Sequence, residues 1–470
     1  MAEKLKLEKK NFSEWWDKVV SYAKLMDDRY PIKGVYVWMP YGHKAVKLMM
    51  QKVDTILEKR GNQECYFPLF ATKAIFGKEK DFLDGFVGEA LRITAIGRRK
   101  LDEEMIVRPT SEAIIYTMFN LWVRSWRDLP LKVYQTVPIF RWETKMTKPM
   151  FRCREITKFN ETHVALATKE EADENIQEGI EMYKEFFDFL QMPYLILKTP
   201  SWDTFAGALY NYDFFTVMPD GKAVELGSII NLGQKFAKTY DIQYLDKNEK
   251  KQYVWQNTFG LSERSLGSSL SVHGDDKGLI FPSEIAPTQI VIVPILKGDS
   301  NDKKVLKTCE SFNLPFRVYI DSTDGRPGQK FNHWEVKGVP IRLEIGSRDL
   351  ESASVMLARR DTGEKTSVKI TDLEKTISST LTDIDKNLKK TASDFLISMI
   401  KETKDLKSAE KSLEAGGIIK LPWCGDDKCG QSTEEKLVGS ALGIDEKEKA
   451  SGQCVCGKSA KHYLHFARTY

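Results

Sequence analysis

Residues 131–155 constrain the fold more than any other part of this sequence. Leu131–Phe140 is strand-like and continues into Arg141-Trp142-Glu143, and a loop rich in Lys, Thr and Pro then leads to Phe151-Arg152-Cys153-Arg154-Glu155. A strand, a polar loop and a returning strand predict an antiparallel hairpin that carries Arg141 and Arg152 on a common surface. Such a hairpin among helical segments is typical of an α+β fold, in which helices pack on an antiparallel sheet.

The region 1–287 is predicted to be one such domain. Apolar residues at helical spacing predict a helix over His43–Arg60, and Glu64–Phe70 follows as a buried strand. Thr168 and Glu171 fit a capping box, so a second helix is expected to begin after Thr168 and to end before Pro193. Further strands are predicted at Phe214–Met218 and Leu270–His273.

Two further domains are predicted, because a chain of 470 residues is long enough for two to four. Strands and helices alternate over 288–385, the pattern of a small α/β domain: strands at Gln289–Ile295, Phe316–Ile320 and Pro340–Ile345, helices at Lys303–Phe312 and Lys330–Lys337. A lysine-rich helical stretch, Leu373–Ala415, leads into the third region, 386–470.

The composition argues against a membrane protein and against a protein that is basic over its whole surface. With 41% hydrophobic and 29% charged residues, the chain can bury a sizeable core. Lysine and arginine (71) nearly balance aspartate and glutamate (67), so any RNA-binding surface has to be a local patch. No apolar run approaches the roughly 20 residues that span a bilayer, and residues 1–6 lack the apolar core of a signal peptide. We therefore expect a cytoplasmic protein with no membrane segment.

Four of the seven cysteines fall within the last 47 residues: Cys424, Cys429, Cys454 and Cys456. Four thiolates at loop-like spacing suit a closed tetrahedral zinc site, which would be structural. The alternative is a set of free thiols in a loop. Cys65 and Cys309 are interpreted as buried small apolar residues.

The arginines of the hairpin indicate chemistry on phosphate. When a carboxylate attacks the α-phosphate of ATP, fixed cations must neutralise the charge that grows on the phosphoryl oxygens. Arginine suits this task because its planar fork binds phosphate and carboxylate bidentately and stays charged. The alternative is a surface hairpin decorated with solvated charges.

The hairpin resembles motif 2 of the class II aminoacyl-tRNA synthetases, and companion segments occur in the right order. The helix and strand from Tyr41 to Pro68 resemble motif 1, which builds the dimer interface in that family, and Gly260-Leu261-Ser262-Glu263-Arg264 resembles motif 3. This resemblance implies a homodimer, ATP as a substrate with Mg²⁺, and catalytic roles for Arg141 and Arg264. It further implies ATP contacts from Arg141, Glu143, Arg152, Cys153, Glu225, Ser228 and Arg264.

Other segments resemble the prolyl-tRNA synthetases of archaeal and eukaryotic type, among them Arg108-Pro109-Thr110-Ser111-Glu112, Glu161-Thr162-His163 and Phe205-Ala206-Gly207. The resemblance implies a proline pocket made of Thr110, Glu112, Arg141, Phe159, Glu161, His163, Phe205 and Ser262. It also implies tRNA contacts from the 288–385 domain, with Lys337, Arg342, Glu344 and Arg348 as candidates, zinc on the four cysteines, and a C-terminal Tyr470 that reaches back towards the active site.

The sequence departs from that family at several positions. Ile156 stands where an aromatic residue usually stacks on adenine, and Cys153 replaces a threonine. Glu225 stands where glutamine is common, and Ile230-Asn231 replaces a pair of histidines. Because of these changes, the resemblance supports the predicted phosphate contacts better than the predicted adenine contacts.

The function implied is ATP-dependent attachment of proline to tRNA(Pro) in two steps through prolyl-adenylate. About a hundred residues separate motif 2 from motif 3, which leaves no room for a large editing insertion. A pocket sized for proline excludes slightly smaller amino acids poorly, so misactivation of cysteine or alanine is expected. The alternatives are a class II synthetase for threonine or glycine, a non-catalytic synthetase-like protein, and a zinc-dependent RNA-binding protein.

Overall fold

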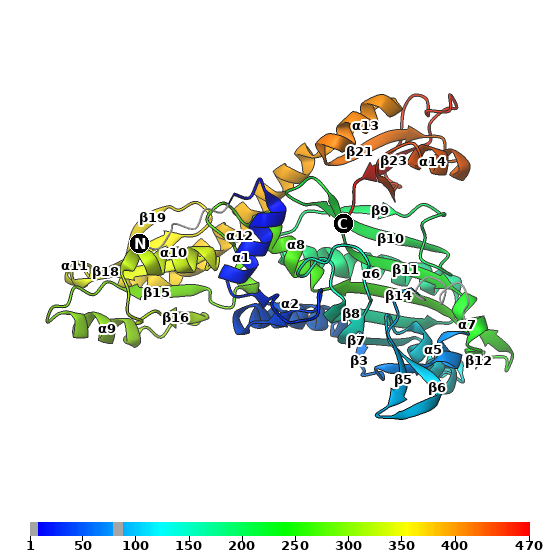
Figure 1. Ribbon diagram of the computed structural model, residues 1–470, viewed down its shortest axis with the longest axis horizontal. Helices are drawn as coiled ribbons and strands as arrows, with labels where there is room; N and C mark the ends of the chain where they lie inside the picture. The colour runs from blue at the N-terminus through cyan, green and yellow to red at the C-terminus, as the bar shows by residue number, and fades with distance from the viewer. Residues whose placement is uncertain (1–7, 79–87) are drawn as a thin grey trace.

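The computed structural model describes residues 8–78 and 88–470 and has three lobes (Figure 1). The largest lobe carries the first half of the chain, a second lobe carries the yellow-green segments, and the orange and red C-terminal segments form the third. Residues 1–6, on which the expected lack of a signal peptide depends, lie outside the described residues.

A seven-stranded sheet forms the centre of the largest lobe, in the order β3-β7-β8-β14-β11-β10-β9. Its strands are β3 (Gln63–Glu64), β7 (Leu131–Phe140), β8 (Glu155–Leu166), β9 (Leu195–Lys198), β10 (Tyr210–Val217), β11 (Ala223–Gly233) and β14 (Trp255–Ser262). All neighbours pair antiparallel except β3, which runs parallel to β7. The expected antiparallel sheet and α+β class are confirmed.

Each face of this sheet has its own apolar core. On one face pack α1 (Phe12–Tyr22), α2 (Pro40–Glu58), α6 (Lys169–Phe189) and α8 (Arg264–His273), with Trp16, Met49 and Phe187 fully buried among them. On the other face, α5 (Glu112–Trp122) and α7 (Lys235–Thr239) cover a smaller core around Tyr116 and Phe236. This second core leaves part of its face uncovered, and the substrate cavity described below lies there.

Small sheets surround this lobe. A three-stranded sheet joins β4 (Phe70–Thr72), β5 (Arg92–Ile96) and β6 (Arg99–Val107), beside the short α3 (Lys73–Phe76). Two hairpin-like pairs are formed by β1 (Met26–Asp27) with β2 (Val37–Trp38) and by β12 (Gln243–Leu245) with β13 (Lys251–Tyr253).

The second lobe is a five-stranded sheet in the order β16-β15-β17-β18-β19. Its strands are β15 (Ile290–Pro294), β16 (Val318–Ile320), β17 (Ile341–Ile345), β18 (Ser354–Arg359) and β19 (Lys365–Lys369), and its helices are α9 (Asp302–Ser311), α10 (Pro327–Val336) and α11 (Ser347–Glu351). The first three strands run parallel, as the strand–helix alternation predicts.

The helix α12 (Leu373–Ser398) leaves this sheet and runs to the third lobe (Figure 1). There a four-stranded sheet, β20-β21-β23-β22, is built from β20 (Ile400–Glu402), β21 (Ile418–Trp423), β22 (Ser440–Gly443) and β23 (His462–Ala467), with α13 (Leu406–Ala415) and α14 (Asp427–Glu434). Lys198 at the end of β9 exchanges two backbone hydrogen bonds with Ile444, of 2.9 and 3.0 Å, so the third lobe is attached directly to the edge of the central sheet.

Most of the predicted elements occur, some with shifted ends. The capping box is present: the Glu171 amide donates to Thr168 Oγ1 at 3.1 Å, and Glu171 Oε2 accepts from the Thr168 amide at 3.3 Å. The helix expected at His43–Arg60 begins earlier, at Pro40. Proline is well placed there because the first helical residue needs no amide hydrogen bond.

Three predictions of secondary structure are wrong. Glu64–Phe70 is not a continuous buried strand: only its two ends enter β3 and β4, and Tyr66 between them is 75% exposed. Leu270–His273 is the last turn of α8, because this short apolar run packs its helical face on the central sheet. The stretch Leu373–Ala415 is broken after Ser398, where β20 joins the sheet of the third lobe.

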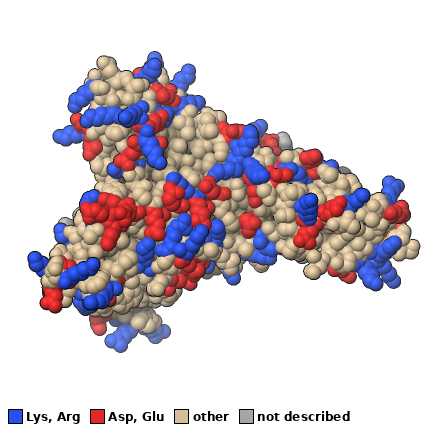
Figure 2. All heavy atoms as spheres, turned by 180° about the vertical axis from the view of Figure 1, so that it is seen from behind, with Lys and Arg blue, Asp and Glu red and all other residues tan. Residues whose placement is uncertain are grey.

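The surface carries both signs of charge. On the face in Figure 2, lysine and arginine are interspersed with aspartate and glutamate over all three lobes, as the near-balanced composition predicts. Among the described residues, none of the helices combines the length and apolarity that crossing a bilayer requires.

Candidate active site

One row of directly paired residues crosses the central sheet beneath the cavity. The pairing runs from Asp213 to Ser228, to Gly260, to Glu161 and to Gln135, on β10, β11, β14, β8 and β7. Residues that pair directly across antiparallel strands point to the same face of a sheet. Gly260 in the middle has no side chain, so an open floor lies between Glu161 and Ser228.

Above this row lies a cavity of about 490 Å³. Its wall includes nine of the residues predicted from sequence: Thr110, Glu112, Arg141, Phe159, Glu161, Phe205, Glu225, Ser228 and Arg264. These residues come from segments more than 150 positions apart, and the antiparallel pairing of β8, β14 and β11 brings them together.

Two buried carboxylates form one end of the cavity. Thr110 Oγ1 donates to Glu112 Oε2 at 2.6 Å, while Glu161 Oε1 accepts from Gln135 Nε2 at 2.8 Å and from Ser111 Oγ. Burial raises the pKa of Glu112, and the neighbouring Glu161 adds to this rise. Burial opposes ionisation of Glu161 as well, but the nearby His163 and hydrogen bonds from Ser111 and Gln135 hold its pKa below the usual value. This end is therefore suited to a buried cation.

His163 lies next to Glu161 in the interior, outside the cavity wall. It is fully buried, its Nε2 lies 3.6 Å from Glu161 Oε2, and its Nδ1 is hydrogen-bonded to the Tyr116 hydroxyl at 3.1 Å. It does not line the cavity. Its place in the structure is that of a partner that orients Glu161.

Two arginines line the same cavity. Arg141 is the first residue after β7; its Nε donates to the Pro109 carbonyl at 2.9 Å, and its guanidinium lies 5.7 Å from the centre of the Phe159 ring. Arg264 begins α8, and its Nε donates to the Phe151 carbonyl at 3.2 Å. Burial lowers the pKa of Arg141, and the positive charge of Arg264 lowers it further. Two guanidinium groups held this close attract an anion.

Four further predicted residues do not line the cavity. Glu143 and Arg152 pair with each other, with Arg152 Nε 3.7 Å from Glu143 Oε2. Cys153 is 3% exposed with its Sγ towards the Lys148 carbonyl, so its thiol packs inside the motif 2 loop. Ser262 accepts a hydrogen bond from the Arg264 amide at 3.2 Å, which fixes the start of α8.

The structure adds polar cavity residues that sequence reasoning missed. Thr199 and Asp203 come from the segment between β9 and β10, and Asn211 and Asp213 come from β10. Asn211 Nδ2 donates to Asp213 Oδ2 at 2.8 Å. Burial raises the pKa of Asp213 to about 7, and Glu225 contributes to the rise. Two polar residues at alternate positions of β10, Asn211 and Asp213, were the available signal.

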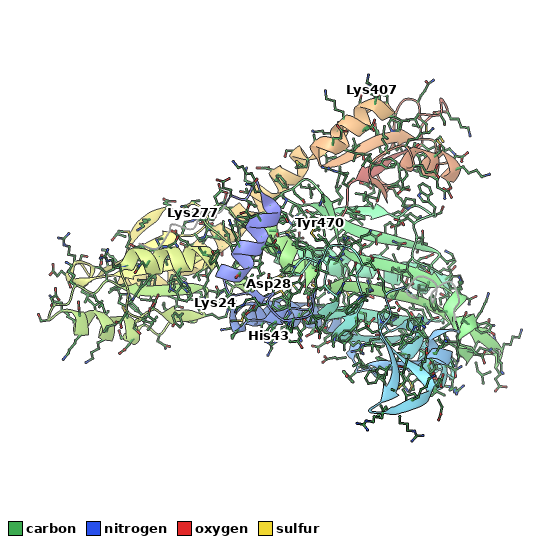
Figure 3. All side chains as sticks on the ribbon, viewed as in Figure 1. Lys24, Asp28, His43, Lys277, Lys407 and Tyr470 are labelled. Atoms are coloured by element: carbon green, nitrogen blue, oxygen red, sulfur yellow. The ribbon has the colours of Figure 1, made fainter. Side chains whose placement is uncertain are left out.

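The C-terminal residue also reaches this cavity, as the resemblance implies. Tyr470 and Thr469 line it, and the Tyr470 ring stacks on Phe151 with the ring centres 5.2 Å apart. The Tyr470 hydroxyl donates to Asp220 Oδ2 at 2.8 Å, and the Tyr470 amide donates to the Ala223 carbonyl at 3.2 Å. Figure 3 shows Tyr470 inside the molecule, over the central sheet.

The candidate RNA-binding residues lie in the second lobe. Arg342 and Glu344 share one face of β17: Arg342 Nε donates to Glu344 Oε1 at 3.0 Å, and each is less than a tenth exposed. Lys337 Nζ lies over the rings of Tyr41 and Trp334, at 4.5 and 4.9 Å. Arg348 is exposed on α11. Arg348 is therefore an exposed cation, Lys337 is a cation over aromatic rings, and Arg342 and Glu344 form a buried ion pair.

The four predicted cysteines converge in the third lobe. Their sulfur atoms all lie within 4.8 Å of one another, with Cys429 Sγ 3.5 Å from Cys454 Sγ and Cys456 Sγ 3.7 Å from Cys424 Sγ. Four sulfurs around zinc at about 2.3 Å would be roughly 3.8 Å apart. The donor set and its spacing therefore fit a tetrahedral thiolate-bound metal.

Comparison with known protein families matches three successive parts of the chain. Three family models match in order: the tRNA synthetase class II core domain (G, H, P, S and T) over residues 94–273, an anticodon binding domain over 289–380, and the prolyl-tRNA synthetase C-terminal domain over 406–470.

Full-length relatives have the same extent as this chain. It is 42% identical to the proline--tRNA ligase of Thermococcus kodakarensis, covering 100% of both chains, and 44% identical to that of Methanobrevibacter smithii, covering 98% of this chain and 99% of the relative. The solved structure of Giardia lamblia prolyl-tRNA synthetase in complex with prolyl-adenylate matches with a TM-score of 0.95 at 34% identity, covering 99% of each chain. This chain therefore belongs to the proline--tRNA ligases, a family of class II aminoacyl-tRNA synthetases.

Proposed function

We propose that the cavity activates proline with ATP and then transfers the prolyl group to tRNA(Pro). The observation that carries this proposal is the combination of charges in one cavity, which is lined by the carboxylates of Glu112 and Glu161 and by the guanidinium groups of Arg141 and Arg264. A free amino acid bound beside ATP offers the complementary charges, an ammonium group for the carboxylates and phosphates for the arginines.

In the first step, the proline ammonium binds between Glu112 and Glu161, and Thr110 adds a hydrogen bond. The rings of Phe159 and Phe205 contact the pyrrolidine ring, and His163 and Ser262 act by holding Glu161 and the start of α8. A proline carboxylate oxygen attacks the α-phosphorus of ATP, and the bond to the leaving pyrophosphate breaks. Arg141 bridges the carboxylate and the α-phosphate, so it opposes the charge that develops between them.

The remaining contacts hold the nucleotide. Arg264 and Arg152 bind the distal phosphates, and Glu143, Glu225, Ser228 and the neighbourhood of Cys153 orient ATP. In the second step, a hydroxyl of the 3′-terminal ribose of tRNA attacks the prolyl carbonyl, and AMP leaves with the electron pair of the broken C–O bond. Positioning and charge stabilisation suffice, and no covalent enzyme nucleophile is required.

Two metals belong to this proposal. Glu143 and Glu225 would hold the Mg²⁺ that comes with ATP, because this hard cation prefers carboxylate oxygens, and the metal would supply positive charge to the phosphates. Zn²⁺ is held by Cys424, Cys429, Cys454 and Cys456, and the sulfur separations of 3.5 and 3.7 Å support it. A closed site of four thiolates leaves no position for a reactive water, so zinc stabilises the third lobe.

We assign recognition of tRNA to the second lobe through Lys337, Arg342, Glu344 and Arg348, because unstacked anticodon bases expose edges that such donors and acceptors can read. The matched anticodon binding domain supports this assignment. The proposed domain division is 1–287 for catalysis, 288–385 for the anticodon and 386–470 for zinc.

The protein is proposed to act as a homodimer in the cytoplasm. In support of the dimer, β3 is an edge strand of the central sheet, and an edge strand offers unpaired backbone groups to another chain. Large apolar side chains are exposed nearby, with Tyr66 at 75% and Phe70 at 44%.

Specificity is proposed to be incomplete. The sequence between motif 2 and motif 3 is short and forms α6, α7 and the strands from β8 to β14, which supports the proposal that no editing domain is inserted there. A missing methylene is worth roughly 1–3 kcal/mol in binding. Cysteine and alanine should therefore be activated at a measurable rate.

The test is proline-dependent ATP–pyrophosphate exchange. Arg141→Ala should lower kcat by about 10²–10³, the loss seen when one transition-state donor is removed, while Arg127→Ala, an exposed arginine far from the cavity, should leave it unchanged. Exchange across the twenty amino acids should be fastest with proline; faster exchange with threonine or glycine would reassign the substrate. Near wild-type exchange in Arg141→Ala would contradict the mechanism.

A further inference from the structure

The substrate cavity has a wall that belongs to two lobes. The segment between β9 and β10 contributes Thr199, Asp203 and Phe205 to it, and the third lobe contributes Ser440, Ala441 and Leu442 from β22. We call residues 199–205 the pocket segment. Phe205 is the proposed wall for the proline ring, so whatever fixes this segment also fixes the proline end of the cavity.

The middle of the pocket segment is held by α14 of the third lobe. Trp202 Nε1 donates to Glu434 Oε2 at 2.8 Å, and Ser201 Oγ donates to Asp427 Oδ2. Gly430 lies beneath the indole: a Cβ at this position would overlap the Trp202 ring, with three ring carbons at 3.0 Å or closer. Asp427, Gly430 and Glu434 are spaced i, i+3 and i+7, so they form one face of the helix.

The same helix connects this contact to the cysteine cluster. Cys429 lies on α14 between Asp427 and Gly430, and the cluster includes its sulfur. Trp202 also packs edge-on against Trp423, with ring centres 5.9 Å apart at 80°, and Trp423 immediately precedes Cys424. The ring of Trp202 therefore rests on two segments that each carry a cysteine of the cluster.

Glu434 joins the two parts of the wall. Its Oε2 accepts from Trp202, and its Oε1 accepts from the Ala441 amide at 2.9 Å. Ala441 itself lines the cavity. One carboxylate on α14 thus fixes the pocket segment and β22 relative to each other.

We propose that Trp202 is a positioning residue for proline: through Glu434 and Gly430 it locks the pocket segment to α14, so that the metal-bound third lobe sets the shape of the proline end of the cavity. This inference rests on the proposed function. It gives the four-cysteine site an effect on substrate affinity in addition to its effect on the stability of the third lobe.

The effect should be selective for proline over ATP. Phe205, Thr199 and Asp203 belong to the pocket segment, whereas Arg141 and Arg264 are anchored on the carbonyl groups of Pro109 and Phe151. Those two anchors lie outside both the pocket segment and α14. A displaced pocket segment therefore disturbs the amino-acid end and leaves the phosphate end in place.

The experiment uses the zinc-loaded full-length protein and measures KM for proline and for ATP separately in pyrophosphate exchange. Trp202→Ala should raise KM for proline about tenfold or more and KM for ATP less than about twofold, since a shift of about 1 Å at a positioning contact can cost up to 10²-fold. Trp202→Phe keeps most of the ring but loses the hydrogen bond to Glu434, so it should give a smaller rise. Gly430→Ala disrupts the same contact from the side of α14, and its effect on the two KM values should resemble that of Trp202→Ala.

Tyr212→Phe is the matched control. The Tyr212 hydroxyl donates to Glu446, another contact between the central sheet and the third lobe, but Tyr212 is not part of the pocket segment. Its KM for proline should equal the wild-type value. A second readout is the rate at which a chelator removes zinc. A non-hydrolysable prolyl-adenylate analogue should slow zinc loss in the wild type and not in Trp202→Ala, because coupling between two binding sites is reciprocal.

The inference is overturned if Trp202→Ala and Gly430→Ala, with zinc content equal to wild type, keep the wild-type KM for proline. Equal rises in both KM values would also overturn it, because a disturbance of the whole cavity, and not of its proline-binding part alone, gives that result. If the alanine variants do not retain zinc, the KM for proline of Trp202→Phe decides. Failure of the proposed function would give a different result, because the wild type itself would then show no proline-dependent exchange.

Discussion

One buried carboxyl group, that of Glu263, has hydrogen bonds to only one of its two oxygens among the described residues. Glu263, next to Arg264, is 1% exposed. Its Oε2 accepts from the Thr157 amide at 3.0 Å, from Thr157 Oγ1 at 2.6 Å and from the Lys158 amide at 3.0 Å, while among the described residues nothing donates to Oε1. Burial raises its pKa to about 7 in spite of these hydrogen bonds.

This carboxyl should make stability depend on pH. Its pKa in the folded protein lies above the unfolded value of 4.5, so the native state holds the proton more tightly. Its contribution to stability is then fully present below pH 4.5 and is lost as the pH rises through about 7. Glu263→Gln removes this loss, so the Tm of the variant minus that of the wild type should increase between pH 5 and pH 8. Calorimetry at both pH values measures it, and Glu14→Gln, at an exposed site, is the control. An unchanged difference would contradict the burial argument.

At the scale of the elements, the packing of α2, which belongs to the motif 1 segment, depends on a glycine. The helix begins at Pro40, and at Gly42 the backbone of Leu25 comes so close that a Cβ would overlap the Leu25 carbonyl oxygen and lie 2.7 Å from its Cα. The glycine is retained inside a helix because this close approach joins α2 to β1, although glycine in a helix costs up to about 1 kcal/mol relative to alanine.

Gly42→Ala should therefore destabilise the protein. Overpacking against a backbone typically costs about 1–3 kcal/mol, and the better helix propensity of alanine does not offset a clash that a side chain cannot relieve. We expect a Tm lower by several degrees. His43→Ala, at the exposed neighbouring position labelled in Figure 3, should change the Tm little. A Gly42→Ala protein as stable as His43→Ala would show that Leu25 moves freely.

The elements that could be predicted are those that local chemistry specifies. The capping box of α6 uses neighbouring residues only, and β7 has the bounds that its sequence predicts. Leu270–His273 was misassigned because four apolar and polar residues in alternation fit a strand as well as the last turn of a helix. Packing of α8 on the central sheet, which no local pattern encodes, decides between the two.

At the scale of the whole molecule, the third lobe carries the four-cysteine cluster and contributes residues to the wall of the cavity. Its core is small, with Leu413, Leu464 and Phe466 buried near the cluster. A core of this size is supported by a structural metal in many proteins. Tyr470 leaves the end of this lobe and stacks on Phe151 at the cavity.

Metal removal should therefore open the third lobe before the rest unfolds. Treatment with a strong zinc chelator, or Cys424→Ser, should make 386–470 sensitive to limited proteolysis, with the catalytic and anticodon lobes still intact by mass spectrometry. Proline-dependent exchange should fall as well, because the lobe forms part of the cavity wall. Cys65→Ser, outside the cluster, should retain wild-type resistance. Equal resistance with and without metal would contradict a structural role for the cluster.

The sequence by itself determined the chemistry: the order of the three motifs, the two arginines and two carboxylates of the cavity, and the four cysteines that converge. Each of these signals lies in a short segment whose residue types are specific to a task. Only the tertiary structure decided which residues share the cavity. Asp213, Asn211 and the Trp202 contact depend on strands paired across the sheet and on a lobe attached at its edge. That lobe is attached through bonds such as the one between Lys198 and Glu446, which are 248 positions apart. Sheet register and lobe attachment depend on which side chains are buried against residues far away in the sequence, and a local sequence pattern does not specify those contacts.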